Sequence, residues 1–196
     1  SIEGPARGIL RAERTALNFL QRMTGIATLT SLFVGKAGRR VAILDTRKTT
    51  PTLRVLEKYA VLCGGGQNHR FGLYDRCLIK DNHRRLWRKG AMARLDEAVR
   101  EARRRFPGRE VEVEVENEAD LSSAMKAGPE WILLDNMAPA RMRRCVRICD
   151  GRSLVEASGG ITLKNIARVA ATGVDAVSLG CLTHSAPAAD LSLEIV

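Results

Sequence analysis

Residues 110–116 read Glu-Val-Glu-Val-Glu-Val-Glu, a strict alternation of acidic and apolar side chains. Successive side chains of a β-strand point to opposite faces, so the valines share one face and the glutamates share the other. A strand buried on both faces would be apolar throughout. The polar face of this strand therefore points either to solvent or into a barrel mouth that binds something charged.

Short apolar runs recur along the rest of the chain, each followed by an amphipathic stretch. We expect strands at 41–45, 76–80, 110–116, 131–135, 153–157 and 174–179, and helices at 10–34, 52–62, 91–105, 118–127, 138–149 and 162–172. This alternation, without hairpin signals, predicts a parallel sheet with helices outside it. Six strands are too few for a complete eight-stranded barrel, so an open doubly wound sheet and an incomplete barrel both remain possible.

Length and composition narrow the class of protein. The 196 residues suit one domain, and a hydrophobic content of 45% supplies a core. No apolar run approaches the roughly 20 residues of a membrane span. A net charge of +10 suits an anionic partner, but only 4% of the residues are aromatic, a poor supply of stacking platforms for single-stranded nucleic acid. We therefore expect small anions as ligands, and neither a membrane nor nucleic acid as partner.

Two further sets of residues have ordinary explanations. The five cysteines are scattered and form no CxxC pair, which indicates thiols in a reducing cytoplasm. The arginine clusters at 84–85, 103–105 and 141–144 fall on or beside expected helices, away from the strand ends. We interpret them as solvated faces.

Polar residues follow one expected strand after another, and ligands of βα folds bind at the carboxyl ends of the strands. The cationic ones suit carboxylates or phosphates; they are Arg47, Lys48, His69, Arg70 and Lys80. Glu114 and Asp135 suit sugar hydroxyls or Mg²⁺. The turn Ser158-Gly159-Gly160 precedes a helix expected from about Thr162, whose N-terminus would add partial positive charge. Together these residues indicate a site for a phosphorylated sugar and a polycarboxylate.

Several strings resemble quinolinate phosphoribosyltransferase, also called carboxylating nicotinate-nucleotide pyrophosphorylase. They appear in the family's order and are ERTALNFLQRMTGIAT, LDTRKTTPTLRVLEKYAVLCGGGQNHRFGL, LIKDNH, EVEVEN, ILLDNM, EASGGI and GVDAVSLGCLTHS. The resemblance implies an α/β fold, an incomplete (β/α) TIM-like barrel with parallel strands and outer helices over residues 36–196. Residues 1–35 would be a helical lead-in from an N-terminal sandwich domain that this chain lacks. It also implies a homodimer or larger homo-oligomer in the cytoplasm.

The implied reaction joins quinolinate to phosphoribosyl pyrophosphate and gives nicotinate mononucleotide, pyrophosphate and CO₂, with Mg²⁺. By resemblance, quinolinate would be bound by Arg14, Arg47, His69, Arg70 and Lys80, with Arg14 donated across a subunit interface. The phosphoribosyl pyrophosphate residues would be Lys48, Glu114, Asp135, Ser158, Gly159, Gly160, Gly180 and His184. Lys48, Glu114 and Asp135 would be the catalytic residues, and the two carboxylates would face Mg²⁺, directly or indirectly.

Two alternatives are weaker. A related pyrophosphorylase-like protein of molybdate operons shares the TRK, GGG and HR motifs but takes another substrate, and the intact DTRKT and IKDNH strings argue against it. An inactive fragment that binds anions or nucleic acid would satisfy the net charge. Such a module has no reason to place Glu114 and Asp135 among cations, because carboxylates repel phosphates unless a metal or a hydroxyl intervenes.

Overall fold

The computed structural model describes residues 2–87 and 94–194. Within them the strands are β1 (Ala42–Leu44), β2 (Cys77–Ile79), β3 (Val111–Val115), β4 (Trp131–Asp135), β5 (Leu154–Ser158) and β6 (Ala176–Ser178). The helices are α1 (Ala6–Ala37), α2 (Arg54–Cys63), α3 (Asp81–Trp87), α4 (Leu95–Arg105), α5 (Glu118–Met125), α6 (Pro139–Cys149), α7 (Ile166–Ala170) and α8 (Cys181–His184). All six expected strands are present, each within two residues of the expected bounds at either end.

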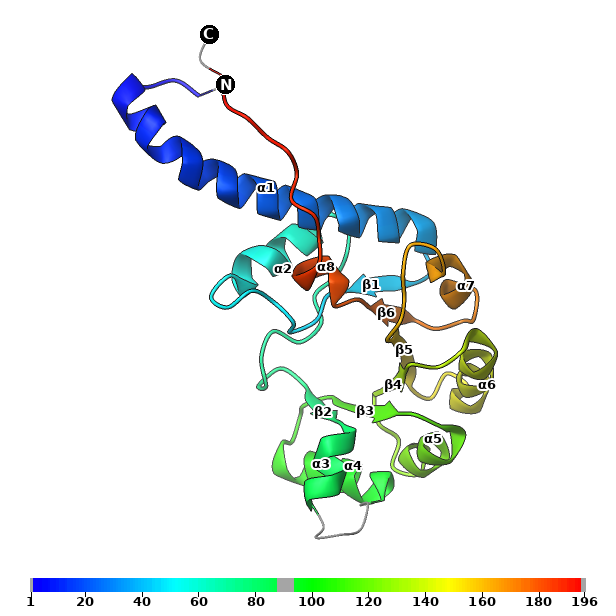
Figure 1. Ribbon diagram of the computed structural model, residues 1–196. Helices are drawn as coiled ribbons and strands as arrows, with labels where there is room; N and C mark the ends of the chain where they lie inside the picture. The colour runs from blue at the N-terminus through cyan, green and yellow to red at the C-terminus, as the bar shows by residue number, and fades with distance from the viewer. Residues whose placement is uncertain (1, 88–93, 195–196) are drawn as a thin grey trace.

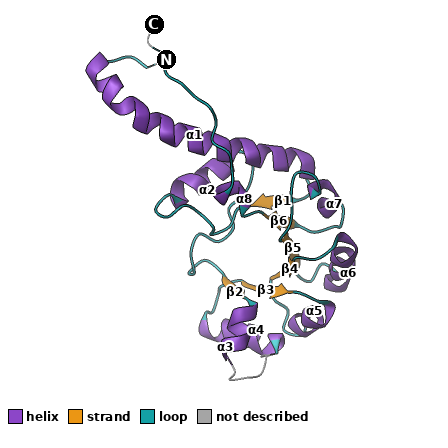
Figure 2. Cartoon of the chain, in the orientation of Figure 1, coloured by secondary structure: helices purple, strands orange, loops and turns teal. Residues whose placement is uncertain are grey.

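The strands form one parallel sheet in the order β1-β6-β5-β4-β3-β2. Figure 2 shows them as a curved arc with the helices on its outer side, and Figure 1 gives the order of the elements. This is an α/β fold of the TIM-like barrel type, and the expectation of an incomplete barrel is confirmed. The first and second strands of the chain lie at opposite edges of the sheet.

The segment 64–76, between α2 and β2, spans these two edges. Its Gln67 pairs with β1, because the N–H of Gln67 donates to the carbonyl of Ile43 at 2.8 Å and its carbonyl accepts from the N–H of Asp45 at 3.2 Å. The chain that follows Gln67 reaches β2 at Cys77. This segment therefore carries His69 and Arg70 across the opening between the two edge strands.

The apolar core lies between the sheet and the helices. Every second residue of β3 is an apolar side chain with no exposed surface, and Val111, Val113 and Val115 make up this set. Leu95 and Val99 of α4 belong to the same core and are also fully buried. We call this helix-facing side of the strands the outer face and the opposite side the inner face.

Helix α1 packs against α2, α7 and β1, and the chain after α8 crosses over it (Figure 1). The crossing explains Gly25, because a Cβ atom there would lie 2.0 Å from the carbonyl oxygen of Pro187. Arg22 of α1 donates to Glu57 of α2 at 2.8 Å. The helix runs through residue 35 without a break, and the division into a lead-in and a barrel domain stays a prediction.

Two helices were not predicted, and two local expectations were wrong. The loops after β2 and β6 contain the helices α3 and α8, which sequence patterning did not predict. Helix α7 begins at Ile166, not near Thr162, because residues 162–165 form a turn in which the N–H of Thr162 donates to Oδ1 of Asn165. Arg84 is not on a solvated face: it is 8% exposed and forms a bidentate pair with Asp120 of α5 at 2.9 and 3.1 Å.

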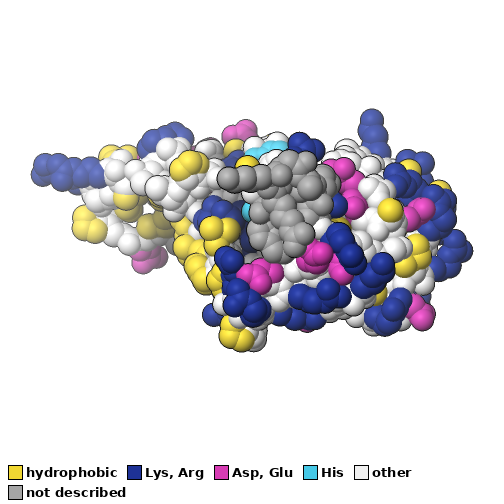
Figure 3. All heavy atoms as spheres, turned by 90° about the horizontal axis from the view of Figure 1, so that it is seen from below, with side chains coloured by type: hydrophobic (Ala, Val, Ile, Leu, Met, Phe, Trp, Pro, Cys, Tyr) yellow, Lys and Arg dark blue, Asp and Glu magenta, His cyan; other side chains and the backbone are white. Residues whose placement is uncertain are grey.

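The surface carries both signs of charge. Figure 3 shows one face, on which Lys and Arg side chains are spread widely with Asp and Glu between them. Within the described residues, no helix is both long enough and apolar enough to cross a membrane. All five cysteines are free thiols.

Candidate active site

The register of the parallel strands places the polar inner-face residues nearest the carboxyl ends in two rows. Glu114 of β3 pairs with Leu133 of β4, which pairs with Glu156 of β5. One row closer to the carboxyl ends, Asp135 pairs with Ser158, which pairs with Ser178 of β6. The glutamate face of β3 therefore points into the barrel and not to solvent, which decides between the two orientations left open by the sequence.

A cavity of about 250 Å³ opens at these carboxyl ends. Cationic side chains line it from three places: the end of β1, the segment 64–76 and the end of β2. Its charged lining residues are Arg47, Lys48, His69, Arg70, Lys80, Glu114, Asp135 and Glu156. The structure therefore brings the predicted cationic group together around one space, apart from Arg14.

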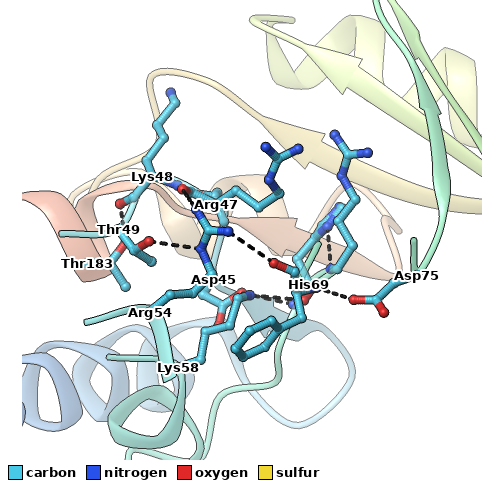
Figure 4. A network of polar contacts seen from close by, with 12 residues as sticks. Asp45, Arg47, Lys48, Thr49, Arg54, Lys58, His69, Asp75 and Thr183 are labelled. Carbon is cyan, nitrogen blue, oxygen red and sulfur yellow. Dashed lines mark hydrogen bonds and ion pairs between the residues drawn. The ribbon is translucent and has the colours of Figure 1, made fainter. Parts of the chain in front are cut away.

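The loop after β1 is fixed from beneath by a buried ion pair (Figure 4). Nζ of Lys58, on α2, contacts Oδ1 of Asp45 and donates to the carbonyl of His69 at 3.0 Å. The same Asp45 oxygen accepts from the N–H of His69 at 2.9 Å. Burial raises the pKa of Asp45 and lowers that of Lys58, and the contact between them acts against both shifts. One ion pair thus ties β1 to the segment that carries His69 and Arg70.

The two cations of the Asp45–Thr49 loop are positioned through their backbone. Arg54 donates to the carbonyl of Arg47 at 3.3 Å, and the hydroxyl of Thr183 donates to the carbonyl of Lys48 at 2.8 Å. Lys48 extends away from the network in Figure 4 and is exposed. Nε of Arg47 is buried and has no hydrogen-bond partner among the described residues. A buried donor without a partner favours an acceptor from a ligand.

His69 lies at the inner end of the cavity and is 9% exposed. Its Nε2 atom is 3.2 Å from Glu112 and 3.3 Å from Glu156. Burial lowers the pKa of His69, but hydrogen bonds to the two glutamates raise it by more, so that it reaches about 9. Burial raises the pKa of Glu156, against the opposing effects of His69 and Ser178. These glutamates were not predicted as site residues.

Lys80, directly after β2, and Glu114, on the neighbouring strand β3, form an ion pair on the inner face. Nζ of Lys80 contacts Oε2 of Glu114, whose side chain is 9% exposed, while the Lys80 side chain is 43% exposed. Oδ2 of Asp135, one row away, accepts from the side-chain amide of Asn136 at 2.9 Å. Two carboxylates thus lie among cations, an arrangement that suits hydroxyl groups or a metal ion that accompanies a polyphosphate.

A second cavity, of about 560 Å³, adjoins the first. Both are bordered by Lys48, Lys80, Glu114 and Asp135, and the second continues to the predicted phosphate-binding residues, which are Ser158, Gly159, Gly160, Gly180 and His184. Gly159 has φ +88°, and a Cβ atom there would lie 2.1 Å from Oδ1 of Asn136. Only glycine fits this turn, which leaves its backbone open to a ligand.

The anion-binding contribution expected from a helix beginning at Thr162 is not provided. Helix α7 starts at Ile166 and has five residues. The N–H of Thr162 is taken by Asn165, and the amide of Asn165 donates to the carbonyl of Gly160 at 3.0 Å. Any anion at residues 158–160 would therefore meet the amides of the turn itself.

Arg14 does not reach either cavity. It lies on α1, is exposed and is not among the lining residues. Sequence reasoning also missed Glu112 and Glu156. Glu112 could have been predicted, because it shares the face of Glu114 on β3. Glu156 is one polar residue within an apolar strand, and no sequence pattern indicates its partners.

Comparisons with known proteins show which family this chain belongs to. A family profile described as "Quinolinate phosphoribosyl transferase, C-terminal domain" matches residues 26–194. The chain is 44% identical to a probable carboxylating nicotinate-nucleotide pyrophosphorylase of Bacillus subtilis (strain 168), over 99% of this chain and 66% of that protein. It is also 44% identical to the carboxylating nicotinate-nucleotide pyrophosphorylase of Mycobacterium leprae (strain TN), over all of this chain and 68% of the relative.

The likeness extends to three dimensions. The solved structure of the nicotinate-nucleotide pyrophosphorylase from Francisella tularensis superposes with a TM-score of 0.89 at 42% identity, and the match covers 95% of this chain and 65% of that one. The chain thus spans about two thirds of the length of these relatives. By sequence and by structure, this chain belongs to the quinolinate phosphoribosyltransferase family.

Proposed function

We propose that this chain carries the site at which quinolinate is joined to phosphoribosyl pyrophosphate, with release of pyrophosphate and CO₂ and formation of nicotinate mononucleotide. The observation that carries the proposal is the pair of adjoining cavities. One has five cationic side chains in its lining and the size for a small dianion, and the other continues to a glycine turn suited to a sugar phosphate. The family's name points to the same pair of substrates.

The charges of the lining residues explain how the two substrates can meet. Quinolinate is a dianion, and its ring nitrogen must attack the anomeric carbon of an even more negative sugar. Arg47, Arg70 and Lys80 would bind the carboxylates, with Lys48 placed between the two cavities. Fixed charges in a partly enclosed site lower the cost of bringing two anions together.

The acidic residues would act on the sugar. As the nitrogen attacks, the bond to pyrophosphate breaks and positive charge develops at the anomeric carbon. Glu114 and Asp135 border both cavities and would stabilise that charge and bind the ribose hydroxyls. The ring nitrogen carries no proton, so attack requires no general base. In decarboxylation the C–C bond breaks, the new pyridinium withdraws the electron pair and the ring carbon then takes up a proton.

Mg²⁺ fits the acidic pair. Glu114 and Asp135 offer carboxylate oxygens at the wall of the second cavity, and Mg²⁺ usually binds through one or two carboxylates together with substrate phosphates. When bound, the ion would neutralise charge on the pyrophosphate as it leaves. The contact between Lys80 and Glu114 means that Asp135 is the more available of the two protein ligands.

Arg14 supports the proposal that the site is completed by a second copy of the chain. It is exposed on α1 and outside both cavities, so it can serve quinolinate only from another subunit. Large apolar side chains are exposed on α1 and α2, among them Phe19, Val55 and Tyr59. Mixing Arg14→Ala with Lys80→Ala chains should restore activity in hybrid dimers, whereas either variant alone should stay inactive. No rescue in a proven hybrid would contradict the shared site.

The function itself is tested by calorimetry with quinolinate and with phthalate, which has both carboxylates but no ring nitrogen. Arg70→Ala should weaken both ligands by about a hundredfold or more, because a charge-assisted contact is lost, and should leave phosphoribosyl pyrophosphate binding within about threefold. Arg143→Ala, an exposed position on α6, is the matched control. Equal loss of both substrates, or an unchanged affinity for quinolinate, would contradict the assignment of the two cavities.

A further inference from the structure

His69 has a protein partner for every one of its polar groups. Its N–H donates to Asp45 at 2.9 Å, and its carbonyl accepts from Lys58 at 3.0 Å. In the ring, Nδ1 accepts from the N–H of Arg70 at 2.7 Å, and Nε2 lies 3.2 Å from Glu112 and 3.3 Å from Glu156. The ring thus connects the acidic interior of the barrel to the backbone of Arg70, whose side chain lines the cavity.

The two glutamates come from strands that are not adjacent. Glu112 is on β3 and Glu156 on β5, with β4 between them, and neither side chain has exposed surface. A buried carboxylate is costly unless a cation or a donor faces it. Glu112 has a second partner, Arg76, at 3.3 Å. Within the described residues, the ion-pair contact of Glu156 is to Nε2 of His69, at 3.3 Å.

We propose that Glu112 and Glu156 are positioning residues of the quinolinate cavity: they hold the Nε2 proton of His69 and so fix the ring that supports Arg70. This inference rests on the function proposed above. When the ring carries a single proton, two contacts favour its place on Nε2: the carboxylates of Glu112 and Glu156 lie at Nε2, and the N–H of Arg70 donates to the lone pair of Nδ1. The two carboxylates raise the pKa of His69 and so favour a second proton, whereas the N–H of Arg70 opposes it, because a proton on Nδ1 would break the contact between them.

The chain has a further link that fits this role. The guanidinium of Arg70 donates to the carbonyl of Arg76 at 3.4 Å, and Arg76 binds both Glu112 and Glu110. Glu112 therefore acts on Arg70 from two sides, through the His69 ring and through Arg76. Loss of the two acidic side chains would release both supports, although neither glutamate is placed in contact with the reacting atoms.

A metal ion is the competing occupant of this cluster. One ligand atom from each of His69, Glu112 and Glu156 lies within 4.8 Å of the others. A metal would have to displace the Nε2 proton, and Arg76 already occupies a carboxylate oxygen of Glu112. Positive charge so close to the cluster disfavours a cation, so the hydrogen-bonded arrangement is the one we adopt.

Nuclear magnetic resonance of the histidine rings tests the proposal without reference to activity. The chain has three histidines, so ¹⁵N-histidine labelling gives few signals, and His69→Asn identifies the ring in question. We expect Nε2 of His69 to keep its proton from pH 6 to 9 and to show a mixed or reversed tautomer in Glu112→Gln/Glu156→Gln. A single-proton ring with its proton on Nδ1 in the unaltered chain would overturn the proposal. So would loss of the Nε2 proton on addition of one equivalent of Zn²⁺.

Ligand binding provides the second measurement. The double variant should weaken quinolinate by about tenfold, the equivalent of one lost hydrogen bond, and leave phosphoribosyl pyrophosphate within about threefold. Glu116→Gln, exposed on the same stretch of chain, is the control and should bind as the unaltered chain does. Unchanged quinolinate affinity in a folded double variant would overturn the positioning role.

The two proposals fail in different ways. If the unaltered chain binds no quinolinate, the proposed function fails, and the histidine signals still decide whether the glutamates hold the ring. If the double variant does not fold, Glu156→Gln alone replaces it, because Glu112 then keeps Arg76 paired. That single variant should still change the tautomer balance of His69, and an unchanged balance would count against the proposal.

Discussion

The outer and inner faces of the same strands are both buried, but their side chains contact different kinds of partner. On β3 the outer residues Val111, Val113 and Val115 have no exposed surface and pack beneath α4 and α5. The inner residues Glu112 and Glu114 are buried almost as completely, at 0% and 9% exposure, but among polar and charged partners. Burial alone therefore does not distinguish the two faces, and the difference lies in what each side chain contacts.

Adjacent residues of one strand therefore have different roles, one in stability and the other in ligand binding. The outer face supplies folding free energy through apolar burial. The inner face is expected to bind and orient ligands, and its side chains are held by pairs such as Lys80 with Glu114 and His69 with Glu112. Substitutions on the outer face should lower the free energy of unfolding, and substitutions on the inner face should weaken ligand binding.

The largest effect is expected from a charge on the outer face. Val113→Asp would bury a carboxylate within the apolar core cluster and should cost more than about 4 kcal/mol of unfolding free energy. Val113→Ala should cost about 2 kcal/mol, since it removes apolar atoms without adding charge. Urea unfolding followed by circular dichroism measures both. A folded Val113→Asp chain of near-normal stability would show that this face is not the core.

The reactivity of the cysteines distinguishes a thiol buried between α6 and the sheet from one on the surface. Cys149 on α6 is 1% exposed, and burial raises the pKa of its thiol to about 11, so at pH 8 it holds about a hundredfold less thiolate than an ordinary thiol. Cys63, at the end of α2, is exposed. Alkylation with iodoacetamide, followed by mass spectrometry of peptides, should label Cys63 first and Cys149 last. Raising the pH towards 11 should narrow the gap, and equal rates at pH 8 would contradict the packing of α6.

The smallest effect on stability is expected from the inner face. Glu114→Gln removes the charge that faces Lys80, but Lys80 is 43% exposed and stays hydrated, so unfolding free energy should change by less than about 1 kcal/mol. Affinity for phosphoribosyl pyrophosphate should fall by about tenfold, because a contact to the ribose or its metal ion is lost. Thermal unfolding and calorimetry measure the two quantities. A large loss of stability with normal affinity for phosphoribosyl pyrophosphate would contradict the binding role of the inner face.

Much of the fold was predictable from local pattern. The alternation at 110–116 gave the strand and its two faces, and the six apolar runs gave the strands of the sheet. Lys80, Glu114 and Asp135 were placed at strand ends by the same reasoning, and the structure brings them together. Helices α3 and α8 were not predicted, because short helices directly after a strand have no period long enough to detect.

What remained hidden depends on contacts between distant parts of the chain. Arg84 appeared to belong to a solvated face, but a partner 36 residues away covers it. Likewise, His69 appeared as one cation among several, and the structure shows its ring held by two strands that are not adjacent to each other.

The sequence by itself determined the succession of strands and longer helices along the chain, the polar character of one face of β3 and the identity of the cations around the site. These follow from side-chain period and residue chemistry, which act within a few neighbouring residues. Only the tertiary structure decided that the glutamate face points inward, that residues 64–76 cross the barrel opening and that Glu112 and Glu156 meet at one histidine. Strand order and register are set by packing of the whole sheet, and no local pattern encodes which residues face each other across a barrel.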